Sequence, residues 1–541
     1  YRSRRQAVQF PTSLYHRNSG GLRLAARLKD RTFPLPEFQN PNVQTPGTPG
    51  GGSGGGSQSF LVMMFLAVAV FLGFQYFQKP KPTSPQPAQS EPANSQASTP
   101  QLAAGSPGAQ KPGAKAPTAP ASATPAFVAS SEAETVVENA DYRIVLSNRG
   151  AVVKHWILKD SHYKDSTRTH QLDMVQQQAS QHFGYPLSLF TYDSGLTTQL
   201  NQALYKPSAT GVLQAPNSLS FHYAQNGVDV VKTFHFDKSY VIDVNVKVSR
   251  DGQPVRALIA WPAGLGDMEE FQGRSAIPGL SRTPSMFAWS LAGKQDTLDA
   301  RKVSNNATLD GDYQYAAAAD LYFTAAFLPD DPQRATVVTL HNTIPLPTDP
   351  ANPNSEKKPA DVIGLAVGDT SGNTSLRLYA GPKQMDIISS IHSIGPDGKQ
   401  DGPTLESLIQ FGSWLGVIAK PLFLALRFLY EHGIPNWGWA IILTTAIFNM
   451  VLLPTRLMMM KSSLKMMRIQ PEVDKIKRKY ANLKATDPKR AEMNAEMIAL
   501  YKQHNVNMYG GCLPLLIQMP LFFAYFRVLE NAVELRQAHW F

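Results

Sequence analysis

This 541-residue sequence has almost no cysteine and no paired histidines. Its single cysteine, Cys512, excludes a disulfide framework and any multi-cysteine zinc or iron–sulfur site. The twelve histidines form no His-x-His or His-x-x-x-His pair, so no histidine metal site is expected. Charged residues make up only 17% of the chain and hydrophobic residues 43%. We therefore expect neither a metal nor a cofactor.

Charge is unevenly distributed along the chain. Residues 1–57 carry a net charge of +6 and residues 456–508 carry +7, whereas residues 127–403 carry −6. Hydrophobic stretches lie at the boundaries between these blocks. Lysine and arginine stay on the cytoplasmic side of membrane spans, so the pattern predicts a cytoplasmic N-terminus, an external central block and a second cytoplasmic block. Nucleic-acid binding, the competing interpretation of a basic block, does not explain the hydrophobic boundaries.

The first 126 residues divide into three segments by composition. Residues 1–57 are basic and end in a Gly/Ser run, which predicts a disordered tail or non-native sequence, with a transit peptide as the alternative. Residues 58–77 contain FLVMMFLAVAVFLGFQYF, whose 18 residues would span about 27 Å as a helix. We expect a retained membrane anchor there. Residues 78–126, rich in Pro, Ala and Ser, are typical of an extended linker.

Residues 127–403 have the pattern of an all-β domain. Hydrophobic and polar residues alternate in DYRIVLSN (141–148), VVKTFHF (230–236), YVIDVNVKVS (240–249) and SLRLYAG (375–381). Such alternation predicts strands with one buried face, and Gly, Pro, Asn and Asp separate the runs. The sequence therefore predicts a large antiparallel β-sandwich, placed outside the membrane by the charge pattern.

The remaining residues predict helices at and across a membrane. Residues 404–431 contain Glu406, Lys420 and Arg427, which favour an amphipathic helix in the outer interface over a span. Residues 436–455 and 512–532 are predicted spans, and residues 533–541 follow the second. The basic segment 456–508 predicts a cytoplasmic helical hairpin, with Pro471 as the first residue of a helix and Asp487 as the N-cap of the returning one. Its coiled-coil stripe is Ile469, Val473, Ile476, Tyr480 and Leu483.

Two long strings resemble a known family. VNMYGGCLPLLIQMPLFFAYFRVLENAVELRQ (506–537), NWGWAIILTTAIFN (436–449) and the basic hairpin between them are similar to the YidC/Oxa1/Alb3 family of membrane insertases. VVKTF (230–234), LYFTAAFLP (321–329) and LYAGP (378–382) are similar to the periplasmic domain of its Gram-negative members. The resemblance covers about residues 58–541.

The resemblance implies a multi-domain membrane protein of the bacterial inner membrane. A β-supersandwich would form the periplasmic domain, with residues 78–435 periplasmic, and an α-helical transmembrane core with a cytoplasmic hairpin would follow. The implied function is non-enzymatic: insertion and folding of nascent membrane proteins, alone or with the Sec translocon, in contact with membrane lipids. The family's last three core helices and its ribosome-binding basic tail are not found in this sequence, so we expect a C-terminally truncated chain.

An insertase of this kind requires a polar groove, and four residues are candidates for its lining. Thr445 and Asn449 are four residues apart and share one helix face, and Gln518 and Arg527 are the polar residues of the second span. Family members usually carry an arginine at the position of Asn449 and an aromatic residue at that of Arg527. We hypothesise that Arg527 supplies the missing positive charge.

Each candidate has a simpler interpretation. Thr445 could bond its own helix, Asn449 a neighbouring helix, Gln518 could only pack, and Arg527 could pair with Glu530 or Glu534. A client-contact surface is also predicted near the cytoplasmic end of the first span, with ordinary packing as its alternative. It comprises Met458, Met459, Met460, Met466 and Met467.

The alternative function is that of a membrane-anchored periplasmic carbohydrate-binding or mutarotase-like protein. Such an enzyme needs histidines and carboxylates that converge in a cleft. No motif unites the available candidates, which are His170, His182, His222, Glu269 and Glu270.

Overall fold

The computed structural model describes residues 126–268, 285–349, 352, 354–411, 414–481, 487–504, 506 and 513–539. The predicted N-terminal tail, membrane anchor and linker lie outside the described residues, apart from residue 126. The described part belongs to one compact unit, Pro85–Phe541.

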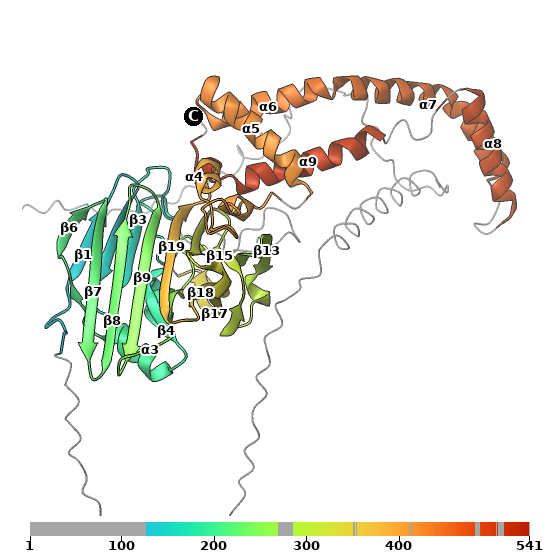
Figure 1. The fold of residues 1–541 in the computed structure, drawn as a ribbon. Coiled ribbons are helices and arrows are strands. Elements are labelled where there is room, and N and C mark those ends of the chain that lie inside the picture. Colours follow the sequence, from blue (N-terminus) through green and yellow to red (C-terminus); the bar gives the residue numbers. More distant parts are fainter. Residues whose placement is uncertain are drawn as a thin grey trace, which may run out of the picture. The chain divides into compact units, whose positions relative to one another are not determined.

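Three sheets form the β domain (Figure 1). The four-stranded sheet has the order β3 (Val152–Leu158), β2 (Tyr142–Ser147), β1 (Glu134–Glu138), β6 (Gly211–Gln214). The five-stranded sheet has the order β14 (Ala307–Asp310), β17 (Ala335–Pro347), β18 (Lys357–Asp369), β11 (Ala257–Trp261), β4 (Ser188–Thr191). The ten-stranded sheet has the order β13 (Lys294–Asp299), β12 (Met286–Leu291), β15 (Tyr313–Ala319), β16 (Phe323–Pro329), β19 (Asn373–Pro382), β9 (Val241–Arg250), β8 (Val228–Phe236), β7 (Asn217–Gln225), β5 (Lys206–Pro207), and β10 (Gln253–Pro254) pairs with β9.

The four alternating runs of the sequence are the strands β2, β8, β9 and β19, so the prediction of an all-β domain is confirmed. Pairing among the described strands is antiparallel except between β1 and β6. In β8 every second residue from Val228 to Phe236 is buried, and all of these side chains except that of Lys232 belong to one continuous hydrophobic core. Trp156 of β3 and Trp261 of β11 meet there with ring centroids 5.9 Å apart, which joins two of the sheets.

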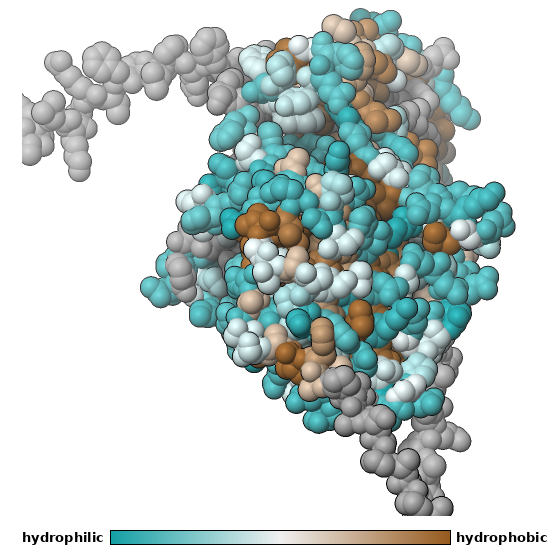
Figure 2. All heavy atoms as spheres, turned by 60° about the vertical axis from the view of Figure 1, so that its left-hand side comes forward, coloured by the Kyte–Doolittle hydropathy of each residue, from teal (hydrophilic) through white to brown (hydrophobic). Residues whose placement is uncertain are grey.

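One face of the β domain is mainly hydrophilic. Figure 2 shows a mainly hydrophilic face over the strands, on which hydrophobic side chains gather only in small, separate patches. Small helical elements connect the strands: α2 (Gln177–Phe183), α3 (Ser194–Gln202), η2 (Ala300–Lys302) and η3 (Pro332–Arg334). A further short helix, α4 (Met385–Ser390), follows the last strand, β19.

Helices follow the β domain. They are η4 (Leu405–Leu408), α5 (Gly416–His432), α6 (Trp437–Val451), α7 (Leu453–Lys479), α8 (Lys489–Gln503), α9 (Leu513–Asn531) and η5 (Val533–Leu535). Within the described residues no single helix has both the length and the hydropathy of a membrane span, whereas α6 and α7 together do, bent by 54°. The bend falls inside the predicted span 436–455, because α6 ends at Val451 and Pro454 stands in the first turn of α7.

The predicted interfacial helix begins later than residue 404. Residues 405–408 form the 3-10 turn η4, whose Leu405 and Leu408 are buried in the core of the β domain. The carbonyl of Leu408 accepts a hydrogen bond from the buried Lys383 ammonium at 3.0 Å. Because this segment packs against the β domain, the regular helix α5 starts only at Gly416.

The prediction that Pro471 begins a helix is wrong. Pro471 lies inside α7, which runs unbroken from Leu453 to Lys479. Packing supplies the reason, since Ile469 and Val473 on either side of the proline are buried against Val506 in one small cluster. This burial offsets the intrahelical hydrogen bond that proline cannot donate. The prediction of Asp487 as the N-cap is off by one residue, because α8 begins at Lys489 and its N-cap is Pro488, which makes no side-chain cap bond. The Asp487 carboxylate still accepts a hydrogen bond from the backbone N–H of Lys489 at 3.0 Å.

Candidate functional site

Helix α6 carries the first pair of predicted groove residues on one exposed face. The Thr445 hydroxyl donates to the carbonyl of Ile441 at 2.8 Å, and the Asn449 amide nitrogen donates to the carbonyl of Thr445 at 2.9 Å. Both side chains therefore donate their hydrogen bonds to backbone carbonyls of α6 itself. For Thr445 this is the alternative interpretation given from the sequence, a hydroxyl bonded to its own helix. The Asn449 side-chain oxygen and the Thr445 hydroxyl oxygen retain acceptor capacity. These side chains are exposed on a helix whose other residues are mostly hydrophobic.

Helices α6 and α9 meet at Tyr525. Its hydroxyl donates to the carbonyl of Ile441 at 3.4 Å, and its ring packs edge-on against Phe448 with centroids 5.6 Å apart. Gln518 precedes Tyr525 by two helical turns, about 10 Å, and so shares its face of α9. Its side chain is partly buried. Its helical position thus places Gln518 on the same side of α9 as Tyr525. Sequence reasoning missed Tyr525, whose aromatic character gave no sign of its partner.

Arg527 points elsewhere. It follows Tyr525 by two residues, about 200° around the helix, and so lies on nearly the opposite face of α9. Its guanidinium forms an ion pair with Glu530 at 3.3 Å, and its side chain is 44% exposed. The pairing is one of the two alternatives that the sequence left open. Of the four predicted groove residues, Thr445 and Asn449 thus share an exposed face of α6, Gln518 is partly buried on α9, and Arg527 pairs with Glu530.

The five predicted methionines divide into two groups. Four are exposed, by 68%, 38%, 54% and 68% respectively: Met458, Met459, Met460 and Met467. The fifth, Met466, packs against the small cluster of Ile469, Val473 and Val506 that joins α7 to the end of α8. The packing alternative therefore applies to Met466, while the other four remain available on the surface of α7.

An exposed polar clamp joins the far end of the α7–α8 hairpin. The Lys479 ammonium and the Tyr480 hydroxyl donate to the Glu496 carboxylate at 2.6 Å and 2.9 Å. The hydrogen bond from Lys479 lowers the pKa of Glu496. The hairpin predicted from the sequence is therefore held by the cluster at one end and by this clamp at the other.

Two surface clefts on the β domain bear on the alternative enzymatic function. The first, of about 450 Å³, is lined by aromatic, amide and two basic side chains, among them Phe183, Tyr185, Asn306, Arg149 and Lys154. None of the five candidate acid–base residues lines it. The predicted acid–base residues therefore do not meet in this cleft.

The second cleft, of about 400 Å³, is lined by His170 with Asp165 and Asp173. The His170 side chain is 83% exposed and lies 3.4 Å from the Asp165 carboxylate. His222 pairs instead with Asp229 on β7 and β8.

His182 contacts the carbonyl of Gln178 in α2. Glu269 and Glu270 lie outside the described residues. The described candidates therefore do not converge, and no cluster of three metal-ligating side chains occurs in the described part of the chain.

A β-sandwich followed by hydrophobic helices and a basic hairpin defines a class of bacterial inner-membrane proteins with a periplasmic domain. Family models agree with this class: the YidC periplasmic domain matches residues 134–425 and the 60Kd inner membrane protein family matches residues 428–541. The chain belongs to the YidC family of membrane protein insertases. This membership bears out the prediction from the sequence that the chain is not an enzyme.

Curated relatives carry the same description. The membrane protein insertase YidC of Geobacter metallireducens is 28% identical over 76% of this chain and 72% of its own length. That of Burkholderia cenocepacia is 30% identical over 65% of this chain and 59% of its own, and that of Wolinella succinogenes is 35% identical over 42% and 36%. The alignments thus span between about a third and three quarters of these relatives.

Solved structures include an active YidC insertase with its first transmembrane domain resolved, at a TM-score of 0.26 and 17% identity, covering 76% of this chain and 75% of that one. YidC from Thermotoga maritima has a TM-score of 0.23 and 12% identity, covering 74% and 99%. A putative aldose 1-epimerase from Escherichia coli has a TM-score of 0.28 and 8% identity, covering 47% and 100%.

Proposed function

We propose that the chain inserts nascent membrane proteins into the bacterial inner membrane through a polar groove that is open to lipid and to the cytoplasm, and helps them to fold. The observation that carries this proposal is the pair Thr445 and Asn449, exposed on the hydrophobic helix α6 beside its contact with α9. Cooperation with the Sec translocon, contact with membrane lipids and contact with ribosomes through cytoplasmic loops and a C-terminal tail belong to the same proposal. So do a multi-pass topology with a cytoplasmic N-terminus and residues 78–435 in the periplasm.

A groove of this kind lowers the barrier to moving a hydrophilic client segment. A charged side chain at the centre of a bilayer costs about 2.5–3.5 kcal/mol on insertion scales. Hydrogen-bonding side chains that keep water part of the way across reduce that cost, and lipid then accepts the client's hydrophobic helix. In this proposal Thr445, Asn449 and Gln518 line the water-containing side of the groove. Tyr525 holds α6 and α9 together.

The groove is tested by removing its polarity while keeping its shape. We expect Thr445→Val combined with Asn449→Leu to slow insertion about tenfold, corresponding to about 1.4 kcal/mol of barrier. The assay is protease protection of a small client in cells depleted of their own insertase, and the deficit should grow with each charge placed in the translocated loop. Ile442→Val, an exposed change on the same helix, is the matched control. An equal deficit for charged and uncharged loops would rule out a hydrating role.

The hypothesis that Arg527 replaces the missing arginine has a separate test. If its guanidinium serves the groove, Arg527→Ala slows insertion and Asn449→Arg restores it in the double variant. If the ion pair with Glu530 is its whole role, Arg527→Ala and Glu530→Ala give the same small effect and Asn449→Arg does not suppress either. Normal insertion by a stably folded Arg527→Ala variant would discard the hypothesis.

The exposed methionines are proposed as the cytoplasmic surface that first contacts a client. A photoreactive side chain at Met458 or Met467 should crosslink to a stalled nascent client. The same group at Met466, which packs inside the hairpin, is the matched control and should crosslink poorly. Equal yields at all three positions would contradict a specific surface.

A further inference from the structure

The turn between β15 and β16, Asp320–Tyr322, has a rigid internal structure and is called the docking turn below. The Asp320 carboxylate accepts hydrogen bonds from the backbone N–H groups of Tyr322 and Phe323 at 2.8 Å and 2.7 Å. The backbone N–H of Asp320 donates to the carbonyl of Phe323 at 3.1 Å. Asp320 and Phe323 are almost fully buried. Such a turn presents its carbonyls and rings in fixed positions.

Lys383 binds the docking turn from one side. Its side chain is buried, and its ammonium donates to the carbonyl of Asp320 at 2.6 Å and to that of Leu408 in η4 at 3.0 Å. Its backbone N–H donates to the carbonyl of Tyr322 at 2.7 Å. Burial lowers the pKa of Lys383 to about 8. Because η4 precedes α5, this lysine ties the start of the helical segment to the turn.

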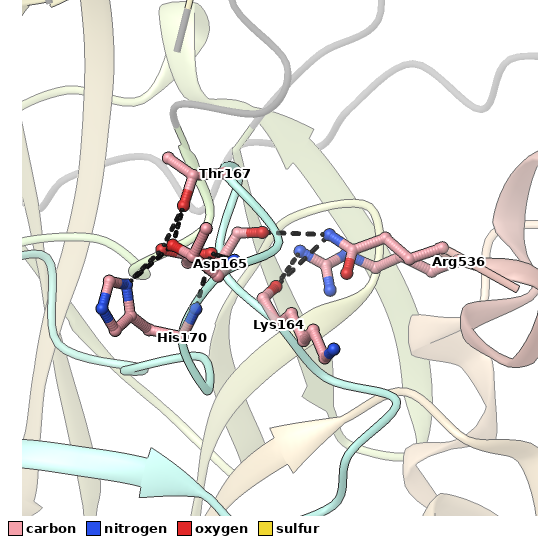
Figure 3. Close-up of polar contacts among 7 residues, drawn as sticks. Lys164, Asp165, Thr167, His170 and Arg536 are labelled. Atoms are coloured by element: carbon pink, nitrogen blue, oxygen red, sulfur yellow. Dashed lines mark hydrogen bonds and ion pairs between the residues drawn. The ribbon is translucent and has the colours of Figure 1, made fainter. Parts of the chain in front are cut away.

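Arg536 reaches the same place from the other end of the helical segment. It follows α9 and η5, is only 4% exposed, and its guanidinium lies 5.2 Å from the ring centre of Phe323 and 5.9 Å from that of Tyr322. It also donates to the carbonyl of Lys164 at 2.9 Å (Figure 3). A guanidinium over aromatic faces, with a carbonyl at its edge, is a favourable and directional arrangement.

Gln537 extends this contact along the loop 164–170. Its amide donates to the carbonyls of Lys164 and Asp165 at 3.3 Å and 3.1 Å. Asp165 in turn holds its own loop, since its carboxylate accepts from the Thr167 hydroxyl at 2.8 Å and from the backbone N–H of His170 at 3.3 Å (Figure 3). The C-terminal segment therefore meets a loop that is organised to present its carbonyls.

A third set of contacts connects α4, α5 and the segment after α9. The Glu534 carboxylate accepts a hydrogen bond from the backbone N–H of Met385 at 3.4 Å. Arg427 of α5 pairs with Asp386 of α4 and with Glu431 at 2.6 Å. Helix α5 also packs directly against α9. The polar contacts thus surround the place where the helices leave and rejoin the β domain.

We propose that the docking turn fixes both ends of the segment 405–537 to the β domain, through Lys383 at the start and Arg536 at the end, and that Arg536 is a positioning residue for the groove. The second half of this statement rests on the proposed insertase function. Arg536 acts at a distance: it does not touch Thr445 or Asn449, but it determines the angle at which α9 leaves the β domain and so the position of Tyr525 against α6.

The experiment measures position and insertion separately, on the full chain in lipid nanodiscs. In a Cys512→Ser background, spin labels at Val212 of β6 and Phe522 of α9, both exposed, report the distance between the β domain and α9. The parent should give one narrow distance distribution. Arg536→Ala should broaden it at least twofold and lower client insertion at least threefold. Arg536→Lys, which keeps the charge over the rings, should restore much of both.

Controls separate positioning from folding and from the function itself. Arg301→Ala removes an exposed arginine that pairs with Asp299 and should change neither readout. If Arg536→Ala unfolds the β domain, Gln537→Ala, which removes only the partly exposed amide, should still broaden the distribution. A narrow distribution in Arg536→Ala overturns the docking proposal. A broad distribution in Arg536→Ala together with normal client insertion overturns the positioning role. If the parent protein inserts no client, the insertase function is refuted, and the distance distributions alone still test the docking proposal.

Discussion

Lys232 shows how a single residue can violate the pattern of its strand and still fit the fold. It occupies an inward position of β8 between Val230 and Phe234 and is fully buried. Its ammonium donates to three carbonyls, those of Gly150 at 2.7 Å, Ala151 at 3.2 Å and Leu187 at 2.8 Å. An ammonium has three donors, so this site matches the group. Alternation predicts that residue 232 faces inward but cannot predict these partners, which are far away in sequence.

Replacing Lys232 with methionine should destabilise the β domain. The methionine fills similar space but leaves three buried carbonyls without their donor, and a buried acceptor without a partner costs on the order of 1–3 kcal/mol. We expect a loss of about 3 kcal/mol in the free energy of unfolding, measured with denaturant. Lys238→Met, at an exposed position just after the same strand, should change stability by less than about 0.5 kcal/mol. Equal effects would contradict the assigned role.

The same residue predicts a dependence of stability on pH. Burial lowers the pKa of Lys232 to about 7, from 10.5 in the unfolded chain. Between these values the unfolded state binds a proton that the folded state does not, so stability should rise as the pH rises from about 7 to about 10.5. In Lys232→Met this slope should be smaller, with a remainder from Lys383, whose pKa is lowered in the same direction. A slope that the substitution leaves unchanged would show that Lys232 does not titrate in this window.

At the scale of elements, local sequence predicted those that have one buried face. β8 and β9 alternate and were predicted, whereas β15 and β16 are buried along their whole length and carry alanines, which have no strong strand preference. The prediction of a helix start at Pro471 was wrong because the burial of Ile469 and Val473 outweighs the local preference of proline for the first turn of a helix. The helical periodicity of the sequence predicted that Thr445 and Asn449 share one face of α6. It could not predict which face of α9 meets α6, because that face is defined by the contacts of Tyr525 with Ile441 and Phe448 in the folded protein.

Ile469 should control the closure of the hairpin. Truncation of a buried isoleucine to alanine costs about 2 kcal/mol or more, equivalent to about a 30-fold change in an opening equilibrium. Ile469→Ala should therefore accelerate amide hydrogen exchange in α8 about 30-fold, as followed by mass spectrometry. Met467→Ala removes an exposed side chain of the same helix and is the matched control. If both variants exchange at the parental rate, the cluster does not hold the hairpin.

At the scale of the whole molecule, contacts between distant segments bind the helices to the β domain. Arg536 and Lys164 are 372 residues apart, and no local pattern of the sequence marks either as a partner. The family resemblance predicted the order of the domains, and the strand and helix patterns predicted most of their elements. The contacts that join them could not be predicted, because each depends on the completed fold of both partners.

Glu534 should make this docking sensitive to pH. Burial raises the pKa of Glu534, so the docked state holds a proton that the undocked carboxyl releases above about pH 4.5. Docking should therefore weaken as the pH rises through the raised pKa. The distance distribution between labels at Val212 and Phe522 should broaden as the pH rises from about 4.5 through the raised pKa in the parent, and not in Glu534→Gln. Glu492→Gln, an exposed change on α8, should behave as the parent, and a distribution in the parent that does not change along this pH titration would exclude the effect.

The bend between α6 and α7 has a mechanical consequence. Leu452 alone separates the two helices, and the Thr455 hydroxyl bonds the Leu452 carbonyl at 2.6 Å, so there is little slack where the 54° change of direction occurs. A force applied to the α7–α8 hairpin would therefore act on α6 as a torque. This torque would rotate Thr445 and Asn449 about the axis of α6. In the proposed topology, a partner that binds the hairpin on the cytoplasmic side would therefore also turn the face of α6 that carries Thr445 and Asn449.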